Sequence, residues 1–149
     1  MHKKILVVHT SYYKKISDGL CAGVINYFEH ESKKDFESLE KEITKNSFDW
    51  LEAPRSFEVP FLINKNKAKY DGFVALGCII RGQTYHFEVI SNEVTRKIMD
   101  LSIEIAKPIG FGVLTCENMN QAEDRSSNNK NNKGSEAAKA CLKLLLDGQ

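Results

Sequence analysis

Short apolar runs recur along this chain in the pattern expected of a buried parallel sheet. Residues 4–9 form a short, continuous apolar run, which is typical of a strand covered on both faces. Comparable runs predict three further strands, at residues 48–53, 72–78 and 109–115.

The stretches between these runs carry apolar residues at intervals of three and four, which is the spacing of amphipathic helices. They predict helices at residues 16–30, 58–69, 84–107, 117–127 and 134–146. Residues 31–46 are mostly charged or polar, but Phe36, Leu39 and Ile43 keep the helical interval. A solvent-exposed amphipathic helix is expected there rather than a basic binding site.

The alternation of strands and helices predicts the fold class. Short connections between parallel strands and crossover helices give a three-layer α/β sandwich, with a four-stranded parallel sheet covered by helices on both faces. Ligands of such sheets bind beyond the carboxyl ends of the strands. Four segments should therefore meet at one edge of the sheet, at residues 9–15, 54–58, 78–86 and 115–118.

Composition supports one domain and narrows the possible partners. The 149 residues are 42% hydrophobic, so a single domain over residues 1–149 can bury roughly 70% of its unfolded surface. The net charge of +1 gives no reason, for the chain as a whole, to expect nucleic acid or an anionic membrane as partner. No apolar run is long enough to span a membrane, and the first residues do not make a signal peptide.

The cysteines indicate a reducing compartment. Cys21, Cys78, Cys116 and Cys141 are widely spaced and form no CxxC pair, so neither a zinc site nor a disulfide framework is indicated. We expect reduced thiols in a cytoplasmic protein.

Candidate chemistry is concentrated in residues 77–86, which read Gly-Cys-Ile-Ile-Arg-Gly-Gln-Thr-Tyr-His. The free N–H groups and the dipole of the helix that follows attract an anion, and Gly82 would let the chain approach a phosphate closely. His86 would stand beside this phosphate, where an imidazole can transfer protons near neutral pH. Taken alone, a histidine in the first turn of a helix is more often a surface or capping residue than a catalyst.

Several separated motifs carry a family resemblance. They are residues 75–87, Phe57-Glu58-Val59-Pro60, residues 111–115 and Asn132-Lys133-Gly134. In order and spacing they resemble the 6,7-dimethyl-8-ribityllumazine synthases, which catalyse the penultimate step of riboflavin synthesis. The resemblance extends from about Lys4 to Leu146.

The resemblance implies a flavodoxin-like fold and a transferase. The reaction would condense 5-amino-6-(D-ribitylamino)uracil with 3,4-dihydroxy-2-butanone 4-phosphate to give the lumazine, phosphate and water. The substrate amine attacks the ketone itself, so no nucleophilic side chain, cofactor or metal ion is expected. Holding two reactants aligned can contribute about 7–11 kcal/mol, whereas a positioned acid or base contributes roughly 10²- to 10⁴-fold in rate. Positioning should therefore dominate.

The resemblance also implies roles for residues at matching positions. His86 would be the catalytic residue that moves protons. The pyrimidine substrate would be bound by Tyr12, Ser56, Phe57, Glu58, Cys78, Ile79, Ile80 and Phe111. The phosphate would be held by Gln83, Thr84, Arg125 and Lys133.

Within this set the side chains suit their implied roles. Tyr12 would stack on the pyrimidine ring, Glu58 would accept hydrogen bonds from ribityl hydroxyls, and Arg125 could donate two hydrogen bonds to phosphate. Without the resemblance, Tyr12 and Phe111 would be taken as core aromatics, Arg125 and Lys133 as solvated cations, and Glu58 as a helix N-terminal acid.

Some positions depart from the family pattern. Ser11-Tyr12-Tyr13 stands where the family has Arg-Phe-Asn, and Arg55-Ser56 replaces the usual Gly-Ala, which puts a bulky cation near the ribityl site. Glycines expected between Arg125 and Lys133 are replaced at Ser127, Asn128 or Asn132. The chain before residue 4 is shorter than usual and residues 31–46 are longer, which bears on assembly rather than on chemistry.

The resemblance implies a homo-oligomer, either a pentamer or a pentamer-based capsid, with active sites at subunit interfaces. Tyr12, Glu58 and His86 would come from one chain, and Phe111, Arg125 and Lys133 from the next, so a monomer would be inactive. The partners would be the small-molecule substrates and riboflavin synthase.

Two other functions stay open. A flavodoxin-like protein could bind a phosphorylated or flavin-like ligand without catalysis, and a structural shell protein could keep the fold without the chemistry.

Overall fold

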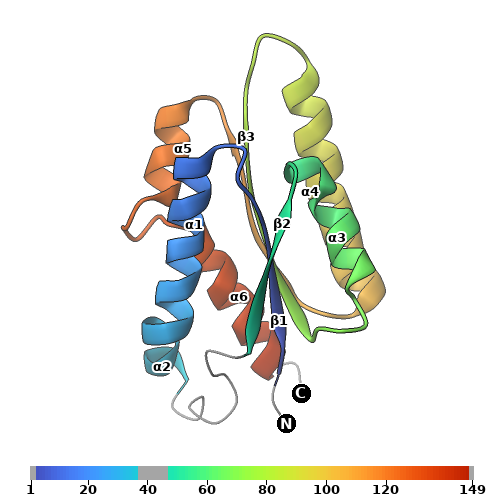
Figure 1. The fold of residues 1–149 in the computed structure, drawn as a ribbon, viewed down its shortest axis with the longest axis vertical. Helices are drawn as coiled ribbons and strands as arrows, with labels where there is room; N and C mark the ends of the chain where they lie inside the picture. The colour runs from blue at the N-terminus through green and yellow to red at the C-terminus, as the bar shows by residue number, and fades with distance from the viewer. Residues whose placement is uncertain (1–2, 37–46, 148–149) are drawn as a thin grey trace.

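Four parallel strands form the centre of the molecule, in the order β2-β1-β3-β4 (Figure 1). The computed structural model describes residues 3–36 and 47–147. The strands are β1 (Ile5–Thr10), β2 (Phe48–Ala53), β3 (Gly72–Ile80) and β4 (Ile109–Cys116). The predicted parallel sheet and its four strands are confirmed.

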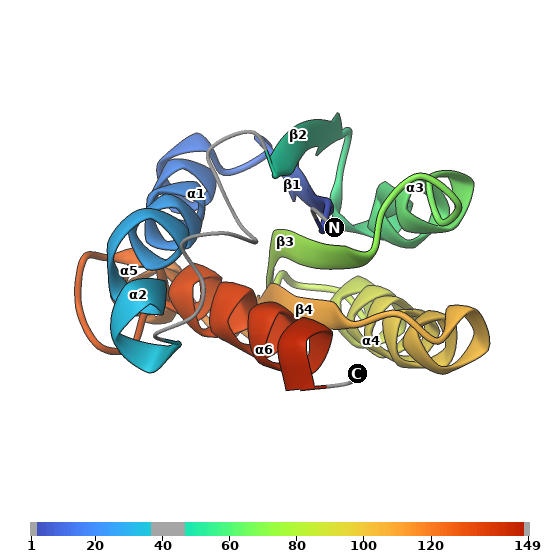
Figure 2. The ribbon, with the colours of Figure 1, turned by 90° about the horizontal axis from the view of Figure 1, so that it is seen from below.

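Helices cover both faces of this sheet (Figure 2). The helices on one face are α1 (Lys14–Asn26), α5 (Met119–Ser126) and α6 (Lys133–Asp147). Those on the other face are α3 (Val59–Lys65) and α4 (His86–Ile105). The predicted three-layer arrangement is confirmed. Among the residues that the structure describes, no helix is both long and apolar enough to span a membrane.

In the described part of the helix predicted over residues 31–46, the chain is helical only as far as Asp35. α1 continues through a π-helical turn, Tyr27–Glu31, into the short helix α2, Ser32–Asp35, and Phe36 is extended (φ −140°, ψ 99°). Buried Ser32 donates to the Phe28 carbonyl at 2.9 Å, and the Tyr27 hydroxyl donates to Asp35 at 2.9 Å, so side-chain contacts accompany the helix beyond its predicted end at residue 30. Residues 37–46, with Leu39 and Ile43, lie outside the described residues.

Alternate residues of the central strands supply two separate cores. Ile5 and Val7 of β1 face the layer of α1 and α6, whereas Leu6 and Val8 face the layer of α3 and α4. All four side chains are at most 2% exposed. The two-residue period of a strand therefore explains why the run is continuously apolar rather than alternating.

The strand register sets the shape of the upper edge in Figure 1. β3 pairs with β1 only as far as Val8↔Ala75, but it pairs with β4 as far as Ile80↔Cys116. The end of β3 thus projects beyond β1.

α6 lies very close to β4. A Cβ atom on Gly110 would stand 2.0 Å from the carbonyl oxygen of Ala137, and this backbone atom cannot move without displacing the helix. Gly82, in contrast, has no atom within 4 Å of such a Cβ position. Both glycines have a negative φ, so the difference between them is one of space alone.

We expect Gly110→Ala to lower the free energy of unfolding by about 2–3 kcal/mol or more, because the added methyl group forces α6 away from the sheet. Gly82→Ala, the matched control, should change it by less than about 1 kcal/mol. Urea unfolding followed by circular dichroism measures both. Equal stabilities for the two variants would contradict this account of how α6 packs.

Candidate active site

A cavity of about 370 Å³ lies at the carboxyl ends of the strands. Its wall comes from the segments after β1 and β2, from the end of β3 and from the first turns of α4. The lining residues are Tyr12, Tyr13, Arg55, Ser56, Phe57, Cys78, Ile79, Ile80, His86 and Ile90. Seven residues predicted for the site are thus brought together in one chain.

Two aromatic rings of the cavity wall remain open to solvent. Tyr12 is 67% exposed and Phe57 is 54% exposed, so Tyr12 is not the core aromatic that its residue type alone suggested. Tyr13 meets Tyr12 edge to face, with ring centroids 5.0 Å apart. Exposed rings beside a cavity can bind a flat heterocycle by stacking.

The segment after β2 is held directly against the end of β3. The buried hydroxyl of Ser56 accepts a hydrogen bond from the backbone N–H of Cys78, at 3.2 Å. A Cβ atom on Gly77 would come within 2.4 Å of the Ser56 hydroxyl oxygen, so a glycine is needed for this close approach. Burial raises the pKa of the Cys78 thiol to about 12, which leaves it protonated and unsuited to act as a nucleophile.

Glu58 stands just outside the cavity lining and pairs with Arg55. Its Oε1 accepts hydrogen bonds from Arg55 Nε at 3.2 Å and from Nη2 at 2.8 Å. Its Oε2 is buried and has no partner among the described residues. The predicted acceptor for ribityl hydroxyls is therefore already engaged through one oxygen.

His86 is the first residue of α4, and its side chain is exposed at the cavity. The backbone N–H of His86 donates to the Thr84 hydroxyl at 3.3 Å. Gln83 and Thr84 are exposed in the loop before the helix and do not line the cavity. The structure thus has the predicted order of strand, open loop and histidine-bearing helix.

Arg81 holds both ends of that loop. Its Nε donates to Glu117 after β4 at 2.6 Å, and its Nη1 donates to Glu88 in the first turn of α4. The guanidinium also lies 4.5 Å from the centre of the Phe87 ring. The hydrogen bond that Arg81 donates to Glu88 holds the pKa of the Glu88 carboxyl below its usual value. One side chain therefore connects β3, β4 and α4 where the loop departs.

Phe111, Arg125 and Lys133 do not reach the cavity of their own chain. Phe111 is 40% exposed on β4. Arg125 Nη1 donates to the Gln121 carbonyl at 3.2 Å, and Lys133 Nζ pairs with Glu136 at 2.9 Å. A single chain therefore leaves these three predicted residues apart from His86.

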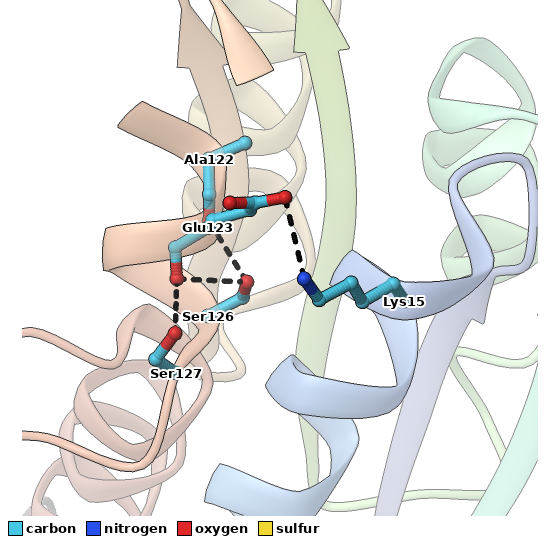
Figure 3. Close-up of polar contacts among 5 residues, drawn as sticks. All are labelled: Lys15, Ala122, Glu123, Ser126 and Ser127. Atoms are coloured by element: carbon cyan, nitrogen blue, oxygen red, sulfur yellow. Dashed lines mark hydrogen bonds and ion pairs between the residues drawn. The ribbon is translucent and has the colours of Figure 1, made fainter. Parts of the chain in front are cut away.

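Arg125 belongs to the last turn of α5. Polar contacts hold this end of the helix (Figure 3). Lys15 of α1 pairs with Glu123 at 3.3 Å, and Ser126 donates to the Ala122 carbonyl at 2.8 Å. Ser127 donates to the Glu123 carbonyl at 2.5 Å. The Ser127 bond satisfies the Glu123 carbonyl, one of the four that the last turn of a helix otherwise leaves without partners.

Asn132 organises the loop from which glycines are missing. Its buried amide donates to the carbonyls of Gly19, Ser126 and Ser127, at 2.9–3.1 Å. Its Oδ1 accepts from the backbone N–H of Ser135 at 3.0 Å, which caps α6. One side chain therefore connects the loop before α6 to α1 and to the end of α5.

Sequence reasoning missed three residues of the cavity wall. Tyr13 and Arg55 are neighbours of predicted residues, and both had been noted only as departures from a family pattern. Ile90 lies one helical turn after His86, so the i, i+4 spacing was the signal that could have found it.

The described residues offer no metal centre of the common kind. Within residues 3–36 and 47–147, no three His, Cys, Asp or Glu side chains are grouped in a way that could hold a metal ion.

Comparison with known proteins identifies the family. A family model described as 6,7-dimethyl-8-ribityllumazine synthase matches residues 2–147. A protein of that name from Bartonella tribocorum is 40% identical, with 97% of this chain and 91% of the relative covered. A protein of the same name from Bartonella henselae is 38% identical, with 95% of this chain and 85% of the relative covered. Another, from Desulfovibrio desulfuricans, is 36% identical, with 95% of this chain and 86% of the relative covered. The predicted resemblance is confirmed, and the chain belongs to the 6,7-dimethyl-8-ribityllumazine synthase family of transferases.

Proposed function

We propose that this chain condenses 5-amino-6-(D-ribitylamino)uracil with 3,4-dihydroxy-2-butanone 4-phosphate, in a cavity completed by a second copy of the chain. The observation that carries the proposal is the group of Tyr12, Phe57 and His86 around one cavity, in a chain of this family. A flat pyrimidine suits the two exposed rings, and the histidine stands at the start of a long helix, where an anion binds favourably.

The cavity suits a reaction that needs alignment more than covalent help from the protein. Its one thiol, Cys78, has its pKa raised by burial, and the reacting amine belongs to the substrate. His86 moves protons during imine formation, phosphate elimination and ring closure. Cys78, Ile79 and Ile80 offer mainly backbone groups to the pyrimidine edge, because they belong to the end of β3 that projects beyond β1.

The phosphate is held by Gln83 and Thr84 from the loop before α4, and by Arg125 with Lys133. A phosphate at this helix start gains from the helix dipole and from the free N–H groups. Because Arg125 and Lys133 lie outside the cavity of their own chain, we assign them to the site of a neighbouring copy. Phe111 closes the same neighbouring site as an aromatic wall.

Exposed apolar side chains support such a neighbour. Phe61 of α3 is 65% exposed, and Met99 and Ile103 of α4 are 62% and 72% exposed. Large apolar groups exposed together on one layer mark a protein interface. We propose a cyclic homo-oligomer built on a pentamer, either as the pentamer itself or as a pentamer-based capsid. In this proposal the protein acts in the cytoplasm, and riboflavin synthase uses its product. Residues 1–149 form one domain in this proposal.

Incubation with both substrates should give lumazine absorbance above the uncatalysed background. Binding of the pyrimidine without product would favour a non-catalytic ligand-binding protein instead. No binding at all would favour a structural shell. These outcomes separate the enzyme from the two alternatives left open by the sequence.

Arg125→Ala should raise KM for the butanone phosphate by about 10²-fold, because charge-assisted hydrogen bonds to the phosphate are lost. His86→Ala should instead lower kcat, by roughly 10²-fold, and should change that KM much less. Steady-state kinetics with the phosphate substrate varied measure both parameters. Equal effects of the two substitutions on KM would contradict the assigned roles.

Co-assembly of the two variants should give activity well above that of either variant alone. An intact site forms where an Arg125→Ala chain supplies His86 and its His86→Ala neighbour supplies Arg125, so random mixing leaves about one quarter of the sites intact. The measurement is the rate at low butanone phosphate after co-expression, with separately expressed proteins mixed after assembly as control. A co-expressed sample no faster than this control would show that both residues serve the same chain's site.

A further inference from the structure

Arg55 is a cation in the cavity wall that the reaction described above does not use. It stands directly before the short 3₁₀ turn Ser56–Glu58, and it lines the cavity together with Tyr12 and Phe57. Its side chain is 62% exposed, so its unused donors can be reached from solvent. The family pattern has a glycine at this position, which could not make the side-chain contacts of Arg55.

The contacts of Arg55 leave part of its guanidinium free. Nε and Nη2 both donate to Oε1 of Glu58, at 3.2 and 2.8 Å. Nη1 makes no hydrogen bond within the described part of the chain. A guanidinium carries five N–H donors in a rigid fork, so the ion pair with Glu58 fixes the plane of the group and leaves further donors available.

The charge balance indicates what kind of ligand these donors suit. Glu58 neutralises Arg55, so this part of the wall is polar without net charge. An unpaired arginine would suit a phosphate, but a neutralised guanidinium with free N–H groups suits neutral acceptors such as hydroxyl oxygens. The phosphate of the proposed reaction also has a separate binding site, at the loop before α4.

Position connects Arg55 to the part of the substrate that carries hydroxyls. Tyr12 lies close enough to Arg55 to act on it electrostatically, although Glu58 is the main reason that the pKa of Arg55 is raised. If Tyr12 stacks on the pyrimidine, Arg55 stands at the border of the ring site. The ribityl chain is the flexible, hydroxyl-bearing substituent that leaves this ring.

We propose that Arg55 is a specificity residue that donates a hydrogen bond from its guanidinium to a hydroxyl of the ribityl chain, with Glu58 holding the guanidinium in place. The proposal rests on the proposed function. The side chain of Arg55 would supply an interaction with the polyol that a glycine at this position cannot make.

Two ligands that differ only in the polyol test the proposal. They are 6,7-dimethyl-8-ribityllumazine and 6,7,8-trimethyllumazine, in which a methyl group replaces the ribityl chain. Arg55→Ala should weaken binding of the ribityl compound by roughly tenfold, since one hydrogen bond from a charged donor is lost, and should leave trimethyllumazine binding unchanged. Arg55→Lys should restore part of the loss, because an ammonium can donate but cannot reproduce the fork.

Lys14→Ala is the matched control. Lys14 is an exposed cation two residues after Tyr12, it pairs with Asp18 at 2.8 Å, and it does not line the cavity. Its removal changes the net charge by the same amount as Arg55→Ala and should leave the binding of both ligands unchanged. Fluorescence titration of the assembled protein measures all the affinities, and thermal unfolding confirms that each variant is folded.

Each other outcome overturns a specific statement. If Arg55→Ala weakens the binding of both ligands equally, Arg55 shapes the cavity and does not contact the polyol. Tighter binding of the ribityl compound would mean that Arg55 competes with the ligand for Glu58. In steady-state kinetics, Arg55→Ala should raise KM for the pyrimidine but not KM for the butanone phosphate. Failure of the unsubstituted protein to bind either lumazine would instead overturn the proposed function.

Discussion

The parallel register of β3 is the constraint on which the candidate site depends. β3 leaves β1 after Ala75 but stays paired with β4 as far as Ile80, so its last residues form a wall beyond the end of β1. Cys78, Ile79 and Ile80 in that wall line the cavity, and the loop that follows carries the chain to His86. A change of one residue in this register would turn each of these side chains to the opposite face.

Ion pairs hold the segments that surround the cavity in position. Arg81 connects the end of β3 with Glu117 and Glu88, so the open loop between them departs from a fixed base. At the cavity, Arg55 forms an ion pair with Glu58 beside the exposed rings of Tyr12 and Phe57. Exposed ion pairs contribute little to stability, so their value here is in holding donors and loops in position. In one chain, aromatic and imidazole groups line the cavity, and Arg125 lies outside it.

The sequence alone determined the architecture and the edge of the sheet at which the candidate site lies. The apolar runs predicted four parallel strands because strands buried on both faces have no polar alternation, and each was found within a few residues of its predicted bounds. Parallel strands bring their carboxyl ends to one edge, so the residues that follow them could be expected to meet. Seven of the predicted site residues do line one cavity, since local motifs such as residues 75–87 depend on backbone conformation and residue type that are encoded nearby.

Only the tertiary structure decided contacts between segments that are distant in sequence. The connection of Arg81 to Glu117 and the hydrogen bond from Asn132 to the Gly19 carbonyl depend on side-chain directions, which periodicity does not specify. The first helix also continues beyond its predicted end, where the Tyr27 hydroxyl donates to Asp35 and the Ser32 hydroxyl donates to the Phe28 carbonyl, contacts that periodicity does not specify either. The sequence thus determined which groups gather at the edge of the sheet, and the packed structure decided which of them hold one another and which remain free for a ligand.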